Sequence, residues 1–107
     1  MQHAQPDIPD EVRAAIRDLR AISGAELVYL FGSRARGDHH EDSDWDLALI
    51  LPDGAARRDV QRSRYLSVHA DAGIEVHPIR RFIYESKKDR PGTLSRSIAE
   101  EGVLIVD

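Results

Sequence analysis

The sequence contains no cysteine. Disulfide bonds, thiolate metal sites and cysteine nucleophiles are therefore excluded. No apolar run approaches the length needed to cross a membrane. The first residues, 1–7, lack the basic region and the apolar region of a signal peptide. We therefore expect a protein with no membrane association and a cytoplasmic location.

The chain also lacks an excess of basic residues. Its formal net charge is −4, whereas proteins that bind nucleic acid along their length usually present a basic face. Direct binding of nucleic acid is therefore not expected. The 107 residues are 41% hydrophobic and 32% charged, which is typical of a globular domain with one modest core. We expect residues 1–107 to form a single domain.

The clearest predicted element is a helix near the N-terminus. Pro9 suits the first helical position, and Asp10 and Glu11 follow in the first turn, where the helix dipole favours acidic residues. Gly24 is expected to end this helix. Apolar residues recur between them at helical spacing: Val12, Ala15, Ile16, Leu19 and Ile22.

The rest of the chain alternates between predicted strands and helices. The predicted strands are 26–31, 44–51, 74–79 and 103–106. The predicted helices are 33–36, 55–70, 81–87 and 93–101. Pro78 lacks a backbone donor, so the third strand is expected at a sheet edge or to end there. This order predicts an α/β domain with helices packed on a small sheet.

Gly32 and Ser33 stand at a predicted strand-to-helix turn. Gly32 carries no side chain, so a ligand can approach its backbone closely. The amides that open the following helical turn have no intrahelical partner and attract phosphate, and the Ser33 hydroxyl can add a hydrogen bond. A Gly-Ser pair alone is most simply an ordinary turn with a helix cap.

Asp44 and Asp46 are two residues apart at the start of a predicted apolar strand. Side chains at this spacing point to the same face of a strand, so the two carboxylates are expected side by side. Their mutual repulsion is relieved by a cation, and Mg²⁺ prefers such hard oxygen ligands. A lone Asp-x-Asp is also consistent with the acidic end of a solvated loop. Trp45, between them, is expected to face the core.

Glu75 lies on the next predicted strand, and its carboxylate reaches the same site if that strand pairs beside residues 44–46. It would then either complete a second metal site or accept the proton of the acceptor hydroxyl. The alternative is an ordinary charged residue on an exposed face. His77 shares the predicted strand face with Glu75, and either lines the site or is a partly buried structural histidine.

Together these features are typical of phosphoryl-type chemistry, in which two metal ions clamp a phosphate between the attacking and leaving oxygens. Arg34 and Arg36 flank the phosphate turn and are candidates for holding triphosphate oxygens. Either arginine is also consistent with a solvated surface turn.

Gly32-Ser33, ten intervening residues and Asp44-Trp45-Asp46 resemble the Gly-Ser-x10-Asp-x-Asp signature of the DNA polymerase β-like nucleotidyltransferase superfamily. The longer strings 32–37 and 43–47 are similar to those of the minimal nucleotidyltransferases (MNT). The resemblance covers residues 26–79, and the tail 98–104 looks like the closing helix and strand of that family. It implies the polymerase β-like fold, with a small mixed sheet and helices packed on it.

The resemblance also implies roles for individual residues. Gly32 and Ser33 would bind the nucleotide phosphates, and Asp44 and Asp46 would bind two Mg²⁺ ions. The third carboxylate of the family, usually an Asp, falls on Glu75, which keeps the charge but reaches one methylene further. ATP is the expected substrate, although these motifs contact phosphates and metal and do not identify the base.

Family members of this size are commonly paired with a HEPN-domain toxin. The resemblance implies an antitoxin that transfers AMP to a tyrosine of that toxin. The alternative is a catalytically weak or inactive module that neutralises its partner by binding alone, which the departure at Glu75 favours. A third and weaker possibility is a nucleotidyltransferase subunit that acts on a small molecule or RNA.

Overall fold

The first helix forms where the sequence predicts it. The computed structural model describes residues 7–56, 58, 61 and 73–106, and in it helix α1 spans Asp10–Ser23 directly after Pro9. Gly24 adopts a left-handed conformation with φ 70° and donates its N–H to the carbonyl of Arg20, which ends the helix. Val12, Ile16 and Leu19 are buried as predicted, but Ile22 in the last turn is 42% exposed.

Four strands make one mixed sheet, as expected. Strand β1 is Leu27–Phe31, β2 is Trp45–Leu51, β3 is Ile74–Arg80 and β4 is Val103–Leu104. Their order is β3-β2-β1-β4, with β2 and β3 parallel and both other pairs antiparallel. Strand β3 is an edge strand, which accommodates Pro78. Strand β4 is shorter than the predicted 103–106.

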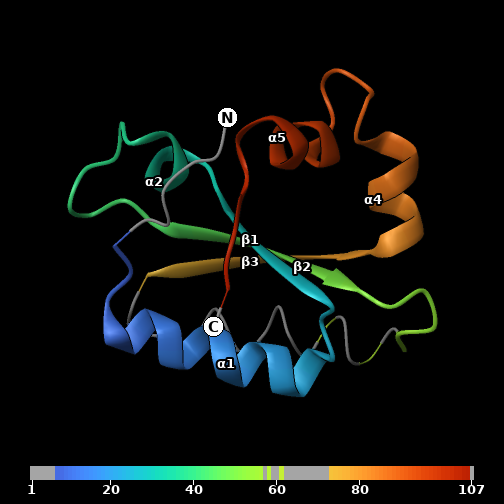
Figure 1. Ribbon diagram of the computed structural model, residues 1–107, viewed down its shortest axis with the longest axis horizontal. Coiled ribbons are helices and arrows are strands. Elements are labelled where there is room, and N and C mark those ends of the chain that lie inside the picture. The colour runs from blue at the N-terminus through green and yellow to red at the C-terminus, as the bar shows by residue number, and fades with distance from the viewer. Residues whose placement is uncertain (1–6, 57, 59–60, 62–72, 107) are drawn as a thin grey trace.

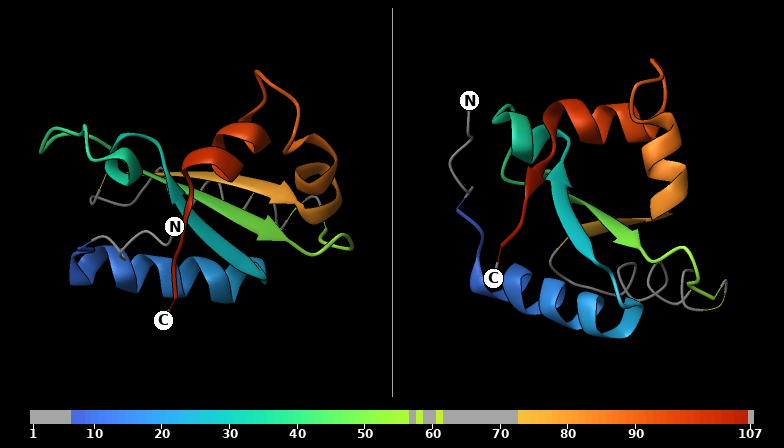
Figure 2. Two further views of the ribbon diagram at one scale, coloured as in Figure 1. Left: turned by 45° about the horizontal axis from the view of Figure 1, so that its top comes forward. Right: turned by 45° about the vertical axis from the view of Figure 1, so that its right-hand side comes forward.

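Helices cover both faces of this sheet (Figures 1 and 2). Helix α1 covers one face, where its apolar side chains pack against alternate residues of β1, β2 and β3. Helices α4, Arg81–Lys87, and α5, Leu94–Glu101, cover the other. Tyr84 of α4 and Ile98 of α5 pack there against Phe31, Ala48 and Ile50. Buried β2 is therefore apolar on both faces except at its beginning, where Asp46 lies.

The short helices α2, Ser33–Arg36, and α5 also form where the sequence predicts them. Helix α2 follows β1 as a single turn. Thr93 caps α5 by accepting a hydrogen bond from the Arg96 N–H at 3.1 Å.

Most of the predicted helix 55–70 lies outside the described residues. In the part of the chain that the structure describes, no helix has the length and apolar character needed to span a membrane.

Candidate active site

The Gly32 turn and Asp46 are in direct contact. Phe31, the last residue of β1, is the register partner of Asp46 on β2, so the turn that follows β1 passes over the Asp46 carboxylate. A Cβ at position 32 would overlap that carboxylate. Gly32 also has φ 78° and ψ −159°, a conformation that is accessible to glycine alone. The glycine and the second aspartate of the motif therefore pack directly against each other, and the missing side chain of Gly32 leaves room for the carboxylate.

Glu75 lies beside Asp46, as the sequence predicts for strands that pair. The two residues are register partners on the parallel strands β2 and β3. Burial, followed by the charge of Glu75, raises the pKa of Asp46. The Asp46 side chain is 23% exposed and that of Glu75 is 58% exposed. Two carboxylates thus share one edge of the sheet, one partly buried and one open to solvent.

His77 completes this cluster. Its Nε2 lies 3.6 Å from Oε1 of Glu75 and 3.9 Å from Oδ1 of Asp46. One donor atom from each of the three residues lies within 4.8 Å of the others. Two carboxylates and an imidazole are a donor set that suits a divalent cation, so the residues present fit a divalent metal ion.

Asp44 is placed differently from Asp46. It precedes β2 by one residue and is exposed, and the group of potential ligand atoms found among the described residues does not include it. Its charge nevertheless helps to raise the pKa of Asp46, though less than burial and the charge of Glu75 do, whereas the charge of His77 lowers that pKa. Trp45 faces the α1 side of the sheet and is buried in the core, as predicted.

Arg34 holds the loop between α2 and β2. Its guanidinium lies 4.4 Å from the centre of the Trp45 ring and donates to two carbonyls, those of Ser43 and Glu41. The shortest of these hydrogen bonds, from Nη2 to Ser43, is 2.9 Å. In this arrangement Arg34 positions the loop that leads to Asp44, and its contact with triphosphate oxygens stays a prediction.

Arg36 is held by two carboxylates. It donates to Asp38 at 3.2 Å and to both carboxylate oxygens of Glu101 at 3.1 Å. These two partners raise the pKa of Arg36 above its ordinary value. Arg36 is therefore held in its charged form close to the Gly32 turn, and its contact with triphosphate oxygens stays a prediction.

Glu101 is a site residue that sequence reasoning missed. Besides pairing with Arg36, its Oε1 accepts a hydrogen bond of 3.1 Å from the N–H of Gly32. The end of α5 is thereby tied to the Gly32 turn across 69 residues of sequence. The only available signal was the acidic residue directly before Gly102 in the tail, and it did not indicate which element that residue would contact.

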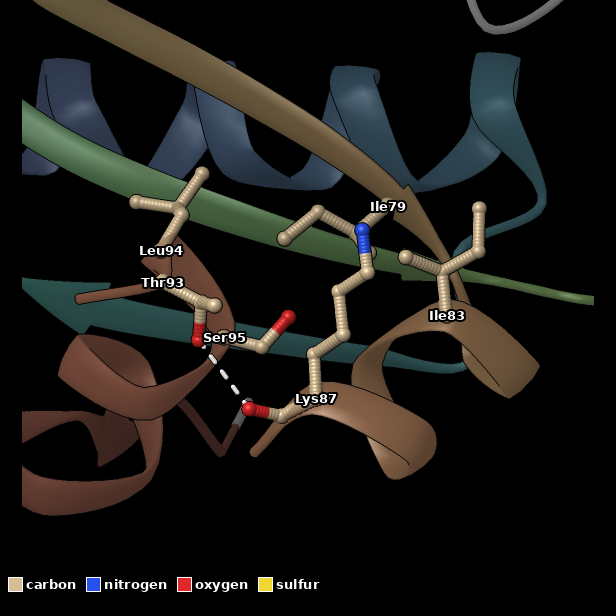
Figure 3. Close-up of a pocket in the computed structure, with 6 residues that line it drawn as sticks. All are labelled: Ile79, Ile83, Lys87, Thr93, Leu94 and Ser95. Atoms are coloured by element: carbon tan, nitrogen blue, oxygen red, sulfur yellow. Dashed lines mark hydrogen bonds between the residues drawn. The ribbon is translucent and has the colours of Figure 1, made fainter. Parts of the chain in front are cut away.

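A pocket lies further along the same face, between α4 and α5 (Figure 3). Ile79 is in its wall, four residues after Glu75 on β3, which corresponds to roughly 13 Å along a strand. The Lys87 side chain extends across the pocket toward Ile79, and the Thr93 hydroxyl donates to the Lys87 carbonyl at 3.0 Å. The pocket has no carboxylate, so it is separate from the Asp46–Glu75–His77 cluster. Its walls are formed by Ile79, Ile83, Lys87, Thr93, Leu94 and Ser95.

A small mixed sheet with helices on both faces and a Gly-Ser turn over paired carboxylates defines a nucleotidyltransferase domain. The family model described as "Polymerase beta, Nucleotidyltransferase" matches residues 17–107. The chain therefore belongs to the polymerase beta nucleotidyltransferase family. None of the curated proteins is a significant match to the chain.

Solved structures share this fold. One, described as a toxin-antitoxin with AMP-PNP, is 20% identical, with a TM-score of 0.57 over 90% of this chain and 72% of the other. A second, a mutant of the toxin-antitoxin MntA-HpeT, is 18% identical, with a TM-score of 0.54 over 89% of this chain and 69% of the other. At these identities the similarity shows the fold.

Proposed function

We propose that this chain transfers a nucleoside monophosphate, AMP from ATP, to a hydroxyl group of a partner protein. The observation that carries the proposal is that Asp46 lies directly beneath the Gly32 turn and has Glu75 as its register partner on the next strand. Membership of the polymerase beta nucleotidyltransferase family supports the type of reaction. The choice of AMP and of a protein acceptor goes beyond that membership.

In this proposal the carboxylates hold Mg²⁺ and the turn holds the triphosphate. Asp44, Asp46 and Glu75 are the proposed metal ligands. Bound Mg²⁺ would neutralise phosphate charge and promote ionisation of the acceptor hydroxyl. Gly32 and Ser33 would contact the phosphates through backbone N–H groups and the Ser33 hydroxyl. Arg36 stands at the same turn and would contribute a fixed positive charge, with Arg34 next to it.

The reaction makes and breaks one bond at the α-phosphorus of ATP. The acceptor oxygen bonds to this phosphorus, and the bond between it and the oxygen of pyrophosphate breaks. The acceptor loses its proton, which the exposed carboxylate of Glu75 is placed to accept when that carboxylate is not a metal ligand. The products are an AMP ester of the acceptor and pyrophosphate.

We further propose that the acceptor is a tyrosine of a HEPN-domain toxin, and that this chain is its antitoxin. The resemblance of the motifs to minimal nucleotidyltransferases supports this partner. The similarity of fold to a toxin-antitoxin with AMP-PNP, an adenine nucleotide, supports both the partner and the nucleotide. The proposed partner would be encoded by the neighbouring gene.

The experiment incubates the purified chain with Mg²⁺, α-labelled ATP and the product of the neighbouring gene. Label is expected on that product, and it should be lost when Asp44→Asn and Asp46→Asn are combined. A matched control is Asp42→Asn, which removes an exposed acidic residue of the preceding loop. Equal labelling by the double variant would contradict the proposed site.

A second candidate function is neutralisation of the partner by binding alone. One contact favours it, because Glu101 engages the N–H of Gly32 and the guanidinium of Arg36, two groups that a triphosphate would use. The Asp44/Asp46 double variant distinguishes the two functions in cells that express the partner. If this variant still suppresses the partner's toxicity as well as the wild type, binding is sufficient; loss of suppression supports transfer.

A further inference from the structure

The backbone places His77 beside the two carboxylates. Ile74 and Val76 of β3 point into the α1 core, so the residues between and after them, Glu75 and His77, face the other side of the sheet. The rings of His77 and Phe31 pack edge to face, with centroids 5.2 Å apart and planes at 67°. This contact leaves the imidazole 27% exposed and its Nε2 near the carboxylates.

The distances suit ligands of one ion better than hydrogen bonds. Separations of 3.6 Å and 3.9 Å from Nε2 to the two carboxylate oxygens are longer than N–H···O hydrogen bonds of 2.7–3.2 Å. Two ligands that each lie about 2.1 Å from a common ion are separated by roughly 3 to 4.2 Å, depending on the angle between them. Both observed separations fall in this interval.

We infer that His77 supplies a nitrogen ligand to the metal site of Asp46 and Glu75, so that this site prefers a first-row transition-metal dication to Mg²⁺. Carboxylates alone suit Mg²⁺, whereas imidazole suits transition metals and is a poor ligand for Mg²⁺. The inference rests on the proposed function for the presence of a metal ion at these carboxylates. It does not depend on which nucleotide or acceptor is used.

The prediction concerns both affinity and the atoms bound. Wild-type protein should bind Co²⁺ at least tenfold more tightly than Mg²⁺ in calorimetric titrations without nucleotide. His77→Ala should weaken Co²⁺ binding at least tenfold and leave Mg²⁺ binding within about threefold, a ratio that corresponds to about 0.7 kcal/mol. Mn²⁺ bound to the wild type should show the ¹⁴N modulation of a coordinated imidazole in pulsed electron paramagnetic resonance, and His77→Ala should abolish it.

His39→Ala is the matched control, because His39 is an exposed histidine of the loop before β2. This variant should retain the nitrogen signal and the Co²⁺ affinity. Circular dichroism and thermal unfolding of each variant establish that it is folded. If His77→Ala does not fold, His77→Gln replaces it, since the amide keeps the approximate size of the ring and removes the imidazole nitrogen.

The outcomes separate this inference from the proposed function. Bound Mn²⁺ without nitrogen modulation in the wild type, or a signal lost in His39→Ala and kept in His77→Ala, would overturn the inference. Equal affinity for Co²⁺ and Mg²⁺ would also overturn it. If the nitrogen signal is present but no nucleotide is transferred to any acceptor, the proposed function fails and the metal assignment stands. If transfer occurs and the signal is absent, the reverse holds.

Discussion

Asp46 of β2 and Glu75 of β3 are register partners on parallel strands, so their carboxylates lie side by side on one face of the sheet. Burial and the charge of Glu75 raise the pKa of Asp46. The folded protein therefore disfavours the ionised form of Asp46 more than the unfolded chain does. The ionised Asp46 carboxylate therefore lowers the stability of the folded state, and a bound cation would relieve this effect.

Asp46→Asn should therefore stabilise the metal-free protein at neutral pH. Because the folded-state pKa is raised, the cost is fully present at pH values above it. The cost shrinks as the pH falls through this pKa and is absent below the unfolded-state value of about 3.9. Thermal unfolding in a chelator should show an increase in Tm of a few degrees at pH 7, since about 1 kcal/mol corresponds to roughly 4–8 °C in a small domain.

The control for this prediction is Asp42→Asn in the exposed loop, which should leave Tm unchanged. The advantage of Asp46→Asn over the wild type should become smaller between pH 7 and pH 4. Addition of Mn²⁺ should raise the Tm of the wild type and not that of Asp46→Asn. A lower Tm for Asp46→Asn at pH 7 in the chelator would show that the carboxylate pair is not repulsive.

Gly32→Ala should damage both stability and activity. The new Cβ overlaps the Asp46 carboxylate, and alanine is strained at φ 78°. Gly37→Ala is the matched control, because φ is 88° there but a Cβ meets none of the described atoms within 4 Å. At Gly37, whose φ of 88° and ψ of 5° are left-handed, alanine costs about 1–2 kcal/mol, and at Gly32, whose ψ of −159° suits glycine alone, it costs at least that much. Overlap should cost Gly32→Ala about 1–3 kcal/mol more.

Chemical denaturation measures this difference directly. Displacement of Asp46 should also reduce nucleotidyl transfer by Gly32→Ala on the order of 100-fold, because small misplacements of reacting groups have effects of that size. Gly37→Ala should keep most of the activity. Equal stabilities for the two variants would mean that Asp46 moves away without cost and that the close contact has no structural role.

How much of this site could be predicted from the sequence depends on how far apart along the chain the contacting residues are. The turn at Gly32, the strand that holds Asp46 and the burial of Trp45 follow from strand alternation and one turn, which are local, and these features are confirmed. The binding roles of Gly32 and Asp46 stay predictions. The position of Glu75 depended on which strand pairs with β2, so its prediction was conditional on that pairing. The structure provides the pairing through the parallel β2–β3 register.

Other features depend on tertiary packing that no local pattern shows. Glu101 reaches Gly32 because α5 packs against β1 and ends beside the Gly32 turn, and nothing in residues 94–101 indicates this placement. Arg34 had a predicted phosphate role, yet its long side chain donates to the Ser43 carbonyl and stacks on Trp45. Side chains with many rotamers are the hardest to place from sequence, because several partners lie within their reach.

Glu101→Ala should destabilise the domain more than Glu101→Gln. The alanine variant leaves the partly buried N–H of Gly32 without its acceptor, which costs about 1–3 kcal/mol, whereas the glutamine oxygen can still accept. Loss of the exposed pair with Arg36 should contribute little, because solvent screens it. Glu100→Ala is the control, since Glu100 pairs with Arg96 on the helix surface. Equal effects of Glu100→Ala and Glu101→Ala on the free energy of unfolding would contradict this role.

Glu75→Gln should reduce kcat for nucleotidyl transfer by about 10² to 10⁴, because it removes the carboxylate that either binds the metal ion or accepts the proton of the acceptor, and loss of an acid–base group has effects of this size. Glu75→Asp should retain activity within about tenfold, because it preserves the charge and restores the residue that the family usually has. Glu85→Gln, on the exposed surface of α4, is the matched control and should be fully active. Wild-type kcat for Glu75→Gln would remove Glu75 from the proposed site.

The central claim is that the carboxylates beneath the Gly32 turn carry out nucleotidyl transfer. The most direct measurement compares α-labelled with γ-labelled ATP in the presence of the neighbouring gene product, for the wild type and Asp46→Asn. We expect label on the acceptor from α-labelled ATP only, and none with Asp46→Asn. Label from γ-labelled ATP, or no label from any of the four nucleoside triphosphates with either Mg²⁺ or Mn²⁺, would contradict the claim.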